Sequence, residues 1–197
     1  MRSTRPRLHR TDVPLLCQAV AVALLIGIGG ISPAVSHAAR PNVILIMVDD
    51  LGCGDLSCYG SQKQNTPVLD QMAKEGVKLT SFYAGATVCS PSRMALLSGA
   101  YPSRVGWEGG VMGYGMPAYG GLSRDVLTIA EAFKQNGYRT AISGKWHIGK
   151  RDLAPMHQGF DQAYYLLFSN NQTKKLWRGD EVIANPFDNR RLTELFT

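Results

Sequence analysis

Hydrophobic and polar residues along the chain follow the periods of strands and helices in turn. Residues 42–48, NVILIMV, form a continuous run of aliphatic side chains, which predicts a strand buried on both faces. Residues 77–83, VKLTSFY, alternate as a half-buried strand does, and residues 138–143, YRTAIS, predict a further strand. We therefore expect three strands in this order along the chain.

Helices are predicted between these strands. One spans residues 66–76, with a Thr-Pro start and a glycine stop, and another begins at Ser90 and Pro91 and ends at a glycine. A third follows Thr128, which forms a capping box with Glu131. The last residues look like the start of a fourth helix. Strands that alternate with helices predict an α/β fold, with a mostly parallel sheet sandwiched by helices.

Residues 106–121 contain seven glycines and predict an irregular loop. Its aromatic residues, Trp107, Tyr114 and Tyr119, are able to stack on a sugar or an aryl ring, so they are candidates for substrate contacts. A purely structural role for the loop is equally compatible with the sequence.

The N-terminal residues 1–38 resemble a signal peptide. Four arginines lie within the first ten residues, residues 19–31 form a short apolar core, and Ser36 and Ala38 fit a cleavage site. An uncleaved anchor is the alternative, and both predict export to the periplasm or the outside of the cell. Cleavage would leave residues 39–197 as one domain without a stable membrane association.

The formal net charge is +6, and the four arginines and Asp12 of the predicted signal peptide account for +3 of it. No run of Lys or Arg is present in the remainder, which argues against nucleic acid as a partner. Beyond the signal peptide the chain has three cysteines, Cys53, Cys58 and Cys89. Their odd number leaves at least one unpaired in an oxidising compartment, and pairing of the first two stays open.

Two adjacent carboxylates, Asp49 and Asp50, directly follow the first predicted strand. Ligands of open parallel sheets gather beyond the carboxyl ends of strands. Adjacent carboxylates there suit a hard divalent cation such as Ca²⁺, although two solvated aspartates in a turn fit the pattern as well.

Cys89 is predicted to lie just before the second helix, with Arg93 in its first turn. A helix N-terminus favours an anion and lowers the pKa of a thiol, and an arginine offers a forked donor to an oxyanion. Further along, Lys145 and His147 share one face if the third strand stays extended through them. A lysine that holds an anion and a histidine that transfers protons would make a hydrolytic pair. A buried structural cysteine and a structural histidine are the alternatives.

These stretches together resemble the N-terminal part of a sulfatase of the formylglycine-dependent arylsulfatase type, a member of the alkaline-phosphatase-like superfamily. The openings RPNVILIMVDDLG and GDLSCYG match that family. The C-x-P-S-R signature with its extension is present as Cys89, Pro91, Ser92, Arg93, Leu97 and Gly99. The second signature is present as Gly137, Tyr138, Thr140, Gly144, Lys145, Trp146, His147 and Gly149. Ser98 stands where the family usually has threonine.

The resemblance implies that a formylglycine-generating enzyme oxidises Cys89 to formylglycine, whose hydrate attacks the sulfur of a sulfate ester. The alcohol leaves, a base then deprotonates the second hydroxyl, and sulfate is expelled as the aldehyde returns. It also implies that Asp49, Asp50 and residue 89 bind Ca²⁺. Arg93 would steady the formylglycine, Lys145 would contact the sulfate, and His147 would assist the elimination.

Sulfatases are much longer than this chain and carry further metal ligands, a second catalytic histidine and another lysine beyond the matching part. We therefore expect the 197-residue polypeptide alone to have little or no sulfatase activity. The expected substrate is a sulfated small molecule or glycan. A phosphate or phosphonate ester hydrolase of the same fold, and a non-catalytic truncated module, are the alternatives.

Overall fold

The computed structural model describes residues 40–112 and 120–196. The chain divides into two units, residues 1–47 and residues 48–197, and only residues 40–47 of the first are described. The second unit carries every helix and strand discussed below. The predicted signal peptide lies outside the described residues. Within the described part, no helix is long and apolar enough to span a membrane.

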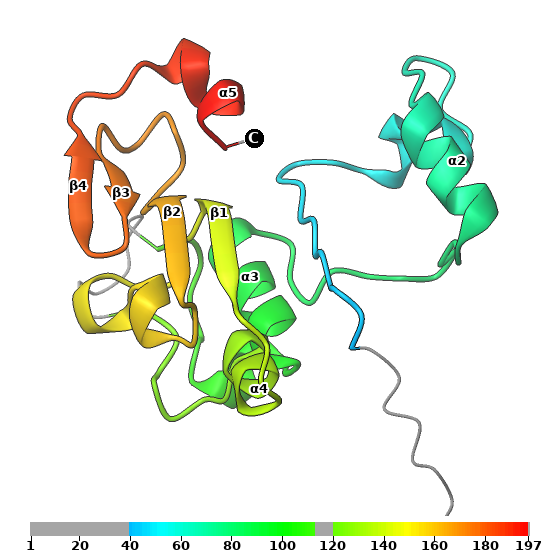
Figure 1. Ribbon diagram of the computed structural model, residues 1–197. Coiled ribbons are helices and arrows are strands. Elements are labelled where there is room, and N and C mark those ends of the chain that lie inside the picture. The colour runs from blue at the N-terminus through cyan, green and yellow to red at the C-terminus, as the bar shows by residue number, and fades with distance from the viewer. Residues whose placement is uncertain (1–39, 113–119, 197) are drawn as a thin grey trace, which may run out of the picture. The chain divides into compact units, whose positions relative to one another are not determined.

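The second unit contains a four-stranded sheet in the order β1-β2-β3-β4 (Figure 1). Strand β1, Ala141–Lys145, pairs in parallel with β2, Gln162–Leu166. Strands β3, Leu176–Arg178, and β4, Glu181–Ala184, continue it with antiparallel pairing. The unit combines helices with a sheet, as the predicted α/β class requires. The sheet is mixed rather than mostly parallel among these strands, because β3 reverses direction after β2 and a tight turn joins β3 to β4 as an antiparallel hairpin.

The four α-helices of the described residues agree with their sequence signals. Helix α2, Pro67–Glu75, begins after Thr66 and ends at Gly76, as predicted. Helix α3 spans Cys89–Ser98, and α5 spans Leu192–Phe196. Helix α4, Ile129–Gln135, begins at the predicted capping box, in which Thr128 accepts from the backbone N–H of Glu131.

The sheet has an apolar cluster on each face, because successive side chains of a strand point to opposite sides. Ile142, Ala163 and Tyr165 pack on one face with Met94 of α3 and Ala130 of α4. The other face carries a smaller cluster, made of Leu166, Leu176 and Phe187 with the partly buried side chains of α5. This packing fixes the carboxyl end of β1 beside helix α3.

Two predicted strands are absent from the structure. Residues 42–48 and 77–83 have no strand, and their apolar side chains are exposed, with Ile44 at 85% and Tyr83 at 83%. Each stretch has the side-chain pattern of a strand, but a strand also needs hydrogen-bonding neighbours and a covered face. Neither stretch belongs to the described sheet.

The third predicted strand is present but shifted toward the C-terminus. It was expected at residues 138–143 and occupies Ala141–Lys145, because Lys145 pairs with Leu166 while Thr140 bonds the turn before β2. Lys145 therefore belongs to the sheet itself. His147 lies two residues beyond its end.

The described part of the glycine-rich segment, residues 106–112 and 120–121, contains no helix or strand, as predicted. Trp107 is buried, and its indole N–H donates to the carbonyls of Gly109 and Gly110. A buried indole that caps its own loop is not available to stack on a substrate, so this candidate contact was wrong. Tyr114 and Tyr119 lie outside the described residues.

Candidate functional site

The first two turns of α3 present Cys89 and Arg93 to one end of the sheet. Cys89 is the first residue of this helix rather than the residue before it, a difference of one position. The N-cap residue, Val88, has no side-chain oxygen, so the free N–H groups of the first turn are not capped by it. The helix therefore begins with exposed positive polarity next to a half-buried thiol.

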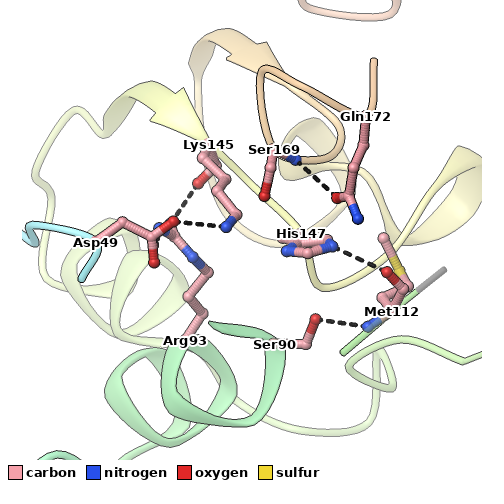
Figure 2. Close-up of polar contacts among 8 residues, drawn as sticks. All are labelled: Asp49, Ser90, Arg93, Met112, Lys145, His147, Ser169 and Gln172. Atoms are coloured by element: carbon pink, nitrogen blue, oxygen red, sulfur yellow. Dashed lines mark hydrogen bonds and ion pairs between the residues drawn. The ribbon is translucent and has the colours of Figure 1, made fainter. Parts of the chain in front are cut away.

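Arg93 is anchored across the gap between α3 and β1 (Figure 2). Its Nη1 donates to the backbone carbonyl of Lys145, and its Nη2 lies 3.7 Å from Asp49 Oδ1. Burial lowers the pKa of Arg93, while the negative charge of Asp49 opposes this shift. An arginine stays protonated at neutral pH even so, and it brings a fixed positive charge to the end of β1.

Asp49 and Lys145 form the shortest ion pair of this cluster, with 2.6 Å between Lys145 Nζ and Asp49 Oδ2. Partial burial acts to raise the pKa of Asp49. The hydrogen bond and charge of Lys145 outweigh it, and Arg93 and Cys89 add to the effect, so the pKa of Asp49 is lower than usual. The carboxylate is therefore ionised at neutral pH.

His147 is fully buried and adopts a left-handed backbone conformation, with φ of 61°. The chain turns sharply there, after Lys145 and the buried Trp146, so the extended backbone on which a shared face of Lys145 and His147 depended is not present at this residue. Left-handed φ at a non-glycine residue is unfavourable and is concentrated at functional sites. Asp50 shows the same feature, with φ of 57°.

A hydrogen-bond chain fixes the imidazole of His147. Its Nε2 lies 2.9 Å from the carbonyl of Met112, whose own N–H donates to Ser90 Oγ of α3 (Figure 2). A carbonyl only accepts, so Nε2 carries the proton and Nδ1 is the unprotonated nitrogen.

Burial lowers the pKa of His147 to about 4, and the positive charges of Lys145 and Arg93 act in the same direction. The hydrogen bond to the Met112 carbonyl opposes these effects but is weaker. The ring is therefore neutral at pH 7, and its basic nitrogen is free to accept a proton.

Two buried polar atoms of the cluster, Arg93 Nε and His147 Nδ1, have no hydrogen-bond partner among the described residues. One is a donor and the other an acceptor. Buried polar atoms are nearly always paired in folded proteins, so an unpaired donor and acceptor beside two cations indicate a place for a polar ligand.

Asp49 and Asp50 provide hard carboxylate oxygens, which suit Ca²⁺, but they form only part of a coordination shell. Ca²⁺ takes six to eight oxygen ligands. Among the described residues, no group of three or more acidic, histidine or cysteine side chains is close enough to hold a metal. The two carboxylates thus fit the chemistry of a calcium site, and further ligands are needed to complete it.

Sequence reasoning missed Ser90, Met112 and Ser169 as parts of the cluster. The Ser169 hydroxyl points toward the side of the cluster where Lys145 and His147 lie (Figure 2). Ser169 follows β2, and Gln172 accepts a hydrogen bond from its backbone N–H at 3.3 Å. Its position beyond the carboxyl end of a parallel strand was the one available signal, and it required locating β2.

Comparison with known proteins gives one family. A sequence model of the family Sulfatase matches residues 41–194. Human steryl-sulfatase is 44% identical over 148 residues, covering 70% of this chain and 25% of the relative. Human arylsulfatase A is 43% identical over 139 residues, covering 68% of this chain and 27% of the relative.

A solved structure, BT4656 in complex with its substrate D-glucosamine-2-N,6-O-disulfate, superposes with a TM-score of 0.62 at 30% identity. The superposition covers 75% of this chain and 28% of the other. The chain thus spans about a quarter of the length of the curated relatives it matches.

Proposed function

The chain belongs to the sulfatase family, and we propose that the protein containing it hydrolyses sulfate esters. The observation that carries the proposal is the cluster at the end of β1. Lys145 and Arg93 bring two positive charges, Asp49 offsets one, and Arg93 Nε and His147 Nδ1 are buried without partners. A tetrahedral oxyanion would provide the negative charge and an acceptor for Arg93 Nε, whereas His147 Nδ1, itself an acceptor, would be left for a proton donor such as a hydroxyl group.

Lys145 is proposed to bind a sulfate oxygen. Its side chain is only 12% exposed, so little water competes for the ammonium group. In the absence of substrate the ammonium rests on Asp49, and an ester sulfate would share or replace that partner. Arg93 lies one turn after Cys89 on α3 and is proposed to orient the side chain of residue 89 toward the sulfur atom.

His147 is proposed to accept a proton through Nδ1. The Met112 carbonyl holds the other nitrogen in its protonated form, and the low pKa keeps the ring neutral. A neutral imidazole fixed at one nitrogen is prepared for general-base catalysis at the other. The acceptor is a backbone carbonyl, so a substitution of the Met112 side chain would not remove it. The backbone therefore fixes the tautomer of His147 with the proton on Nε2.

We extend the proposal to formylglycine at position 89 and to Ca²⁺. A hydrated formylglycine would supply a hydroxyl group as the nucleophile. An unmodified cysteine thiol in an exported protein would instead be open to oxidation. Asp49, Asp50 and the oxygen of residue 89 would provide part of the shell of Ca²⁺, which when bound polarises a sulfate oxygen. Maturation would then require a formylglycine-generating enzyme, and export to the periplasm or beyond.

The substrate class is proposed as aryl or carbohydrate sulfate. The two curated relatives are named for steryl and aryl substrates, whereas BT4656 was solved with a sulfated sugar. An aryl phosphonate shares the oxyanion geometry of an aryl sulfate. Turnover of both compounds by the full-length protein separates a sulfatase from a phosphonate hydrolase, and faster phosphonate hydrolysis would overturn our proposal.

The direct test measures aryl sulfate hydrolysis by the full-length protein and its Lys145→Ala variant. We expect kcat/KM to fall by roughly a hundredfold or more, because an oxyanion loses a charged donor in a largely dry site. Lys74→Ala, at the exposed end of α2, is the matched control and should leave kcat/KM unchanged. Equal rates for all three proteins would contradict the proposed role of Lys145.

Formylglycine is tested by mass spectrometry of the peptide that spans Cys89, from a host that carries the modifying enzyme. The aldehyde is expected, and an intact thiol would contradict it. Calcium is tested by dialysis against a chelator, which should abolish turnover until Ca²⁺ is restored. The 197-residue chain is expected to turn over little substrate alone, because its described residues complete no metal site.

A further inference from the structure

A pocket of about 420 Å³ lies on the sheet face that carries Tyr165, apart from the residues assigned to sulfate hydrolysis. Its lining includes charged and aromatic side chains, namely Lys150, Arg151, Asp152, Tyr165, Trp177 and Asp180. We call this the Tyr165–Trp177 pocket. Its volume is in the range that holds a small organic ligand.

One wall of the pocket is formed by two aromatic side chains. The rings of Tyr165 and Trp177 stack with centroids 6.1 Å apart and planes 20° apart, on neighbouring antiparallel strands in direct register. Burial, with the nearby negative charge of Asp180, raises the pKa of Tyr165 to about 12, so its phenol remains a donor. The aromatic side chains offer an apolar ring face and a polar N–H or O–H group at the ring edge. They suit a sugar ring, which likewise has an apolar face and a polar rim.

Charged side chains of both signs surround this wall. Lys150 and Arg151 are exposed, and neither has an ion pair with a described residue. Asp180 lies 3.6 Å from His157, another lining residue, and Asp152 is exposed. Carboxylates accept hydrogen bonds from hydroxyl groups, and the two cations donate to an oxyanion. The lining therefore matches a ligand with several hydroxyls and one anionic group.

The backbone holds Arg151 at this pocket in an unfavourable conformation. Its φ is 55°, a left-handed value that a side-chain-bearing residue rarely adopts. The segment around it is fixed, because Leu153 packs on Gly149 and Gly121 and its carbonyl accepts from the Trp146 indole. Strain that is held in place beside a pocket is characteristic of ligand-binding positions.

We propose that the Tyr165–Trp177 pocket binds a pyranose that bears a sulfate or carboxylate group, at a site distinct from the one that hydrolyses sulfate. The sugar ring lies against Trp177, Asp152 and Asp180 accept its hydroxyls, and Arg151 with Lys150 holds the anionic group. The pocket is connected to the hydrolytic cluster through Leu167, which lines it and whose carbonyl accepts from the His147 backbone N–H at 3.1 Å. A sulfated or uronate-containing glycan would thereby gain a second point of attachment.

The test follows the indole N–H signal of Trp177 by NMR in the isotope-labelled 197-residue chain. D-glucose 6-sulfate, D-glucuronate and D-glucose are titrated separately. The first two compare sulfate with carboxylate as the anionic group, and D-glucose shows how strongly the neutral sugar binds by itself. We expect a saturable shift with one or both anionic sugars and about tenfold weaker binding of glucose, the effect of one charge-assisted hydrogen bond. No saturable shift with either anionic sugar, or equal binding of glucose, would overturn the proposal.

Two variants localise the contact. Arg151→Ala should weaken binding of the anionic sugar about tenfold. Arg124→Ala, which removes an exposed arginine that does not line the pocket, should not change it, and equal losses would show a general charge effect instead. Thermal unfolding of both variants verifies that each is folded.

The Lys145→Ala variant distinguishes sugar binding in the Tyr165–Trp177 pocket from binding at the cluster of Asp49, Lys145 and His147, which we call the hydrolytic cluster. The Trp177 shift should persist in this variant even though sulfate hydrolysis by the full-length protein is lost. Disappearance of the shift would mean that the sugar binds at the hydrolytic cluster, and it would overturn the second site without affecting the proposed sulfatase activity.

Discussion

Strand β2 and residues 42–48 both carry apolar side chains, but only β2 is a buried strand. Strand β2 has a neighbour on each side, and its Tyr165 and Leu166 are 2% and 3% exposed, each in a cluster on its own face. Residues 42–48 are more apolar, yet they form no strand and stay exposed. The difference shows that an apolar pattern specifies a buried strand only when pairing partners and covered faces are present.

The same contrast extends to whole regions. Residues 89–196 contain all the residues of both apolar clusters, whereas residues 40–88 contribute none. Residues 57–70 are held instead by polar contacts, in which Ser57 Oγ bonds Thr66 and Asp70 at 2.8 and 2.7 Å. Matched substitutions in residues 89–196 and in residues 40–88 should therefore have unequal effects.

Removal of a buried side chain should have the largest effect. Leu166→Ala deletes core volume between β2 and the side chains of α5, and we expect the free energy of unfolding to fall by about 2 to 5 kcal/mol. Ile44→Ala removes an exposed side chain and should change it by less than about 0.5 kcal/mol. Urea denaturation of both variants measures the difference, and similar midpoints would contradict the assigned burial.

Acid should destabilise the region of His147 before the contacts around α2. The pKa of His147 is about 4 in the folded chain, compared with 6.5 for an ordinary histidine, so the unfolded state binds the proton more tightly. Stability is therefore complete above pH 6.5 and is lost as the pH falls toward 4, by up to about 3 kcal/mol. Unfolding measured between pH 7.5 and pH 4 tests this, and His147→Gln should abolish most of the dependence.

The contacts of α2 should respond at lower pH. The hydroxyl of Ser57 lowers the pKa of Asp70 below 3.8, with help from Thr66. Its contribution is therefore present above pH 3.8 and is lost only below that value. Hydrogen exchange at pH 4.5 should show the backbone around His147 opening more readily while α2 is unchanged, and the reverse order would contradict both assignments.

A methyl group at Gly159 should destabilise the chain by about 2 kcal/mol. The residue has φ of 90°, and a Cβ would lie 2.5 Å from the backbone nitrogen of Glu131, inside the capping box of α4. Gly54 has no atom within 4 Å of its Cβ position, so Gly54→Ala is the control in residues 40–88. Thermal unfolding of Gly159→Ala and Gly54→Ala should give a lower Tm for the first alone.

The smallest effect is expected at the two threonine N-caps. Thr128 Oγ1 accepts from Glu131 N at 3.1 Å and is buried, so Thr128→Ala should destabilise by about 1 kcal/mol. Thr66 makes no side-chain bond to the N–H groups of α2, and its hydroxyl bonds Ser57 and Asp70 instead. Thr66 is only half-buried, so water replaces these contacts more readily, and Thr66→Ala should have a smaller effect. Circular dichroism during urea denaturation compares them, and a larger loss at Thr66 would be the contrary result.

Elements of this fold could be predicted from the sequence where neighbouring residues determine them. The helix starts at Thr66 and Thr128 and the stop at Gly76 are set by residues within one turn, and the structure confirms all three positions, although only Thr128 forms a capping hydrogen bond. Strands β2, β3 and β4 were not recognised, because aromatic and charged residues such as those around Tyr165 and Trp177 give no clear alternation. Their register depends on the neighbouring strand rather than on the residues themselves.

The candidate site divides in the same way. Cys89, Arg93, Lys145 and His147 were identified from residue type and spacing, and the structure brings their elements to one end of β1. The partner of Asp49 was not identified, because Lys145 is 96 residues away in the sequence. The role of Trp107 was misjudged, since its burial depends on the packing of its own loop.

By itself, the sequence of this chain determined where helices α2 and α4 begin and the chemical types of residue in its candidate site. These depend on backbone preferences and side-chain chemistry, which act over a few residues. Only the tertiary structure decided which apolar runs became strands, which nitrogen of His147 is basic, and that Tyr165 and Trp177 form one wall of a pocket. Those features arise from contacts between distant residues, and the sequence pattern does not encode them locally.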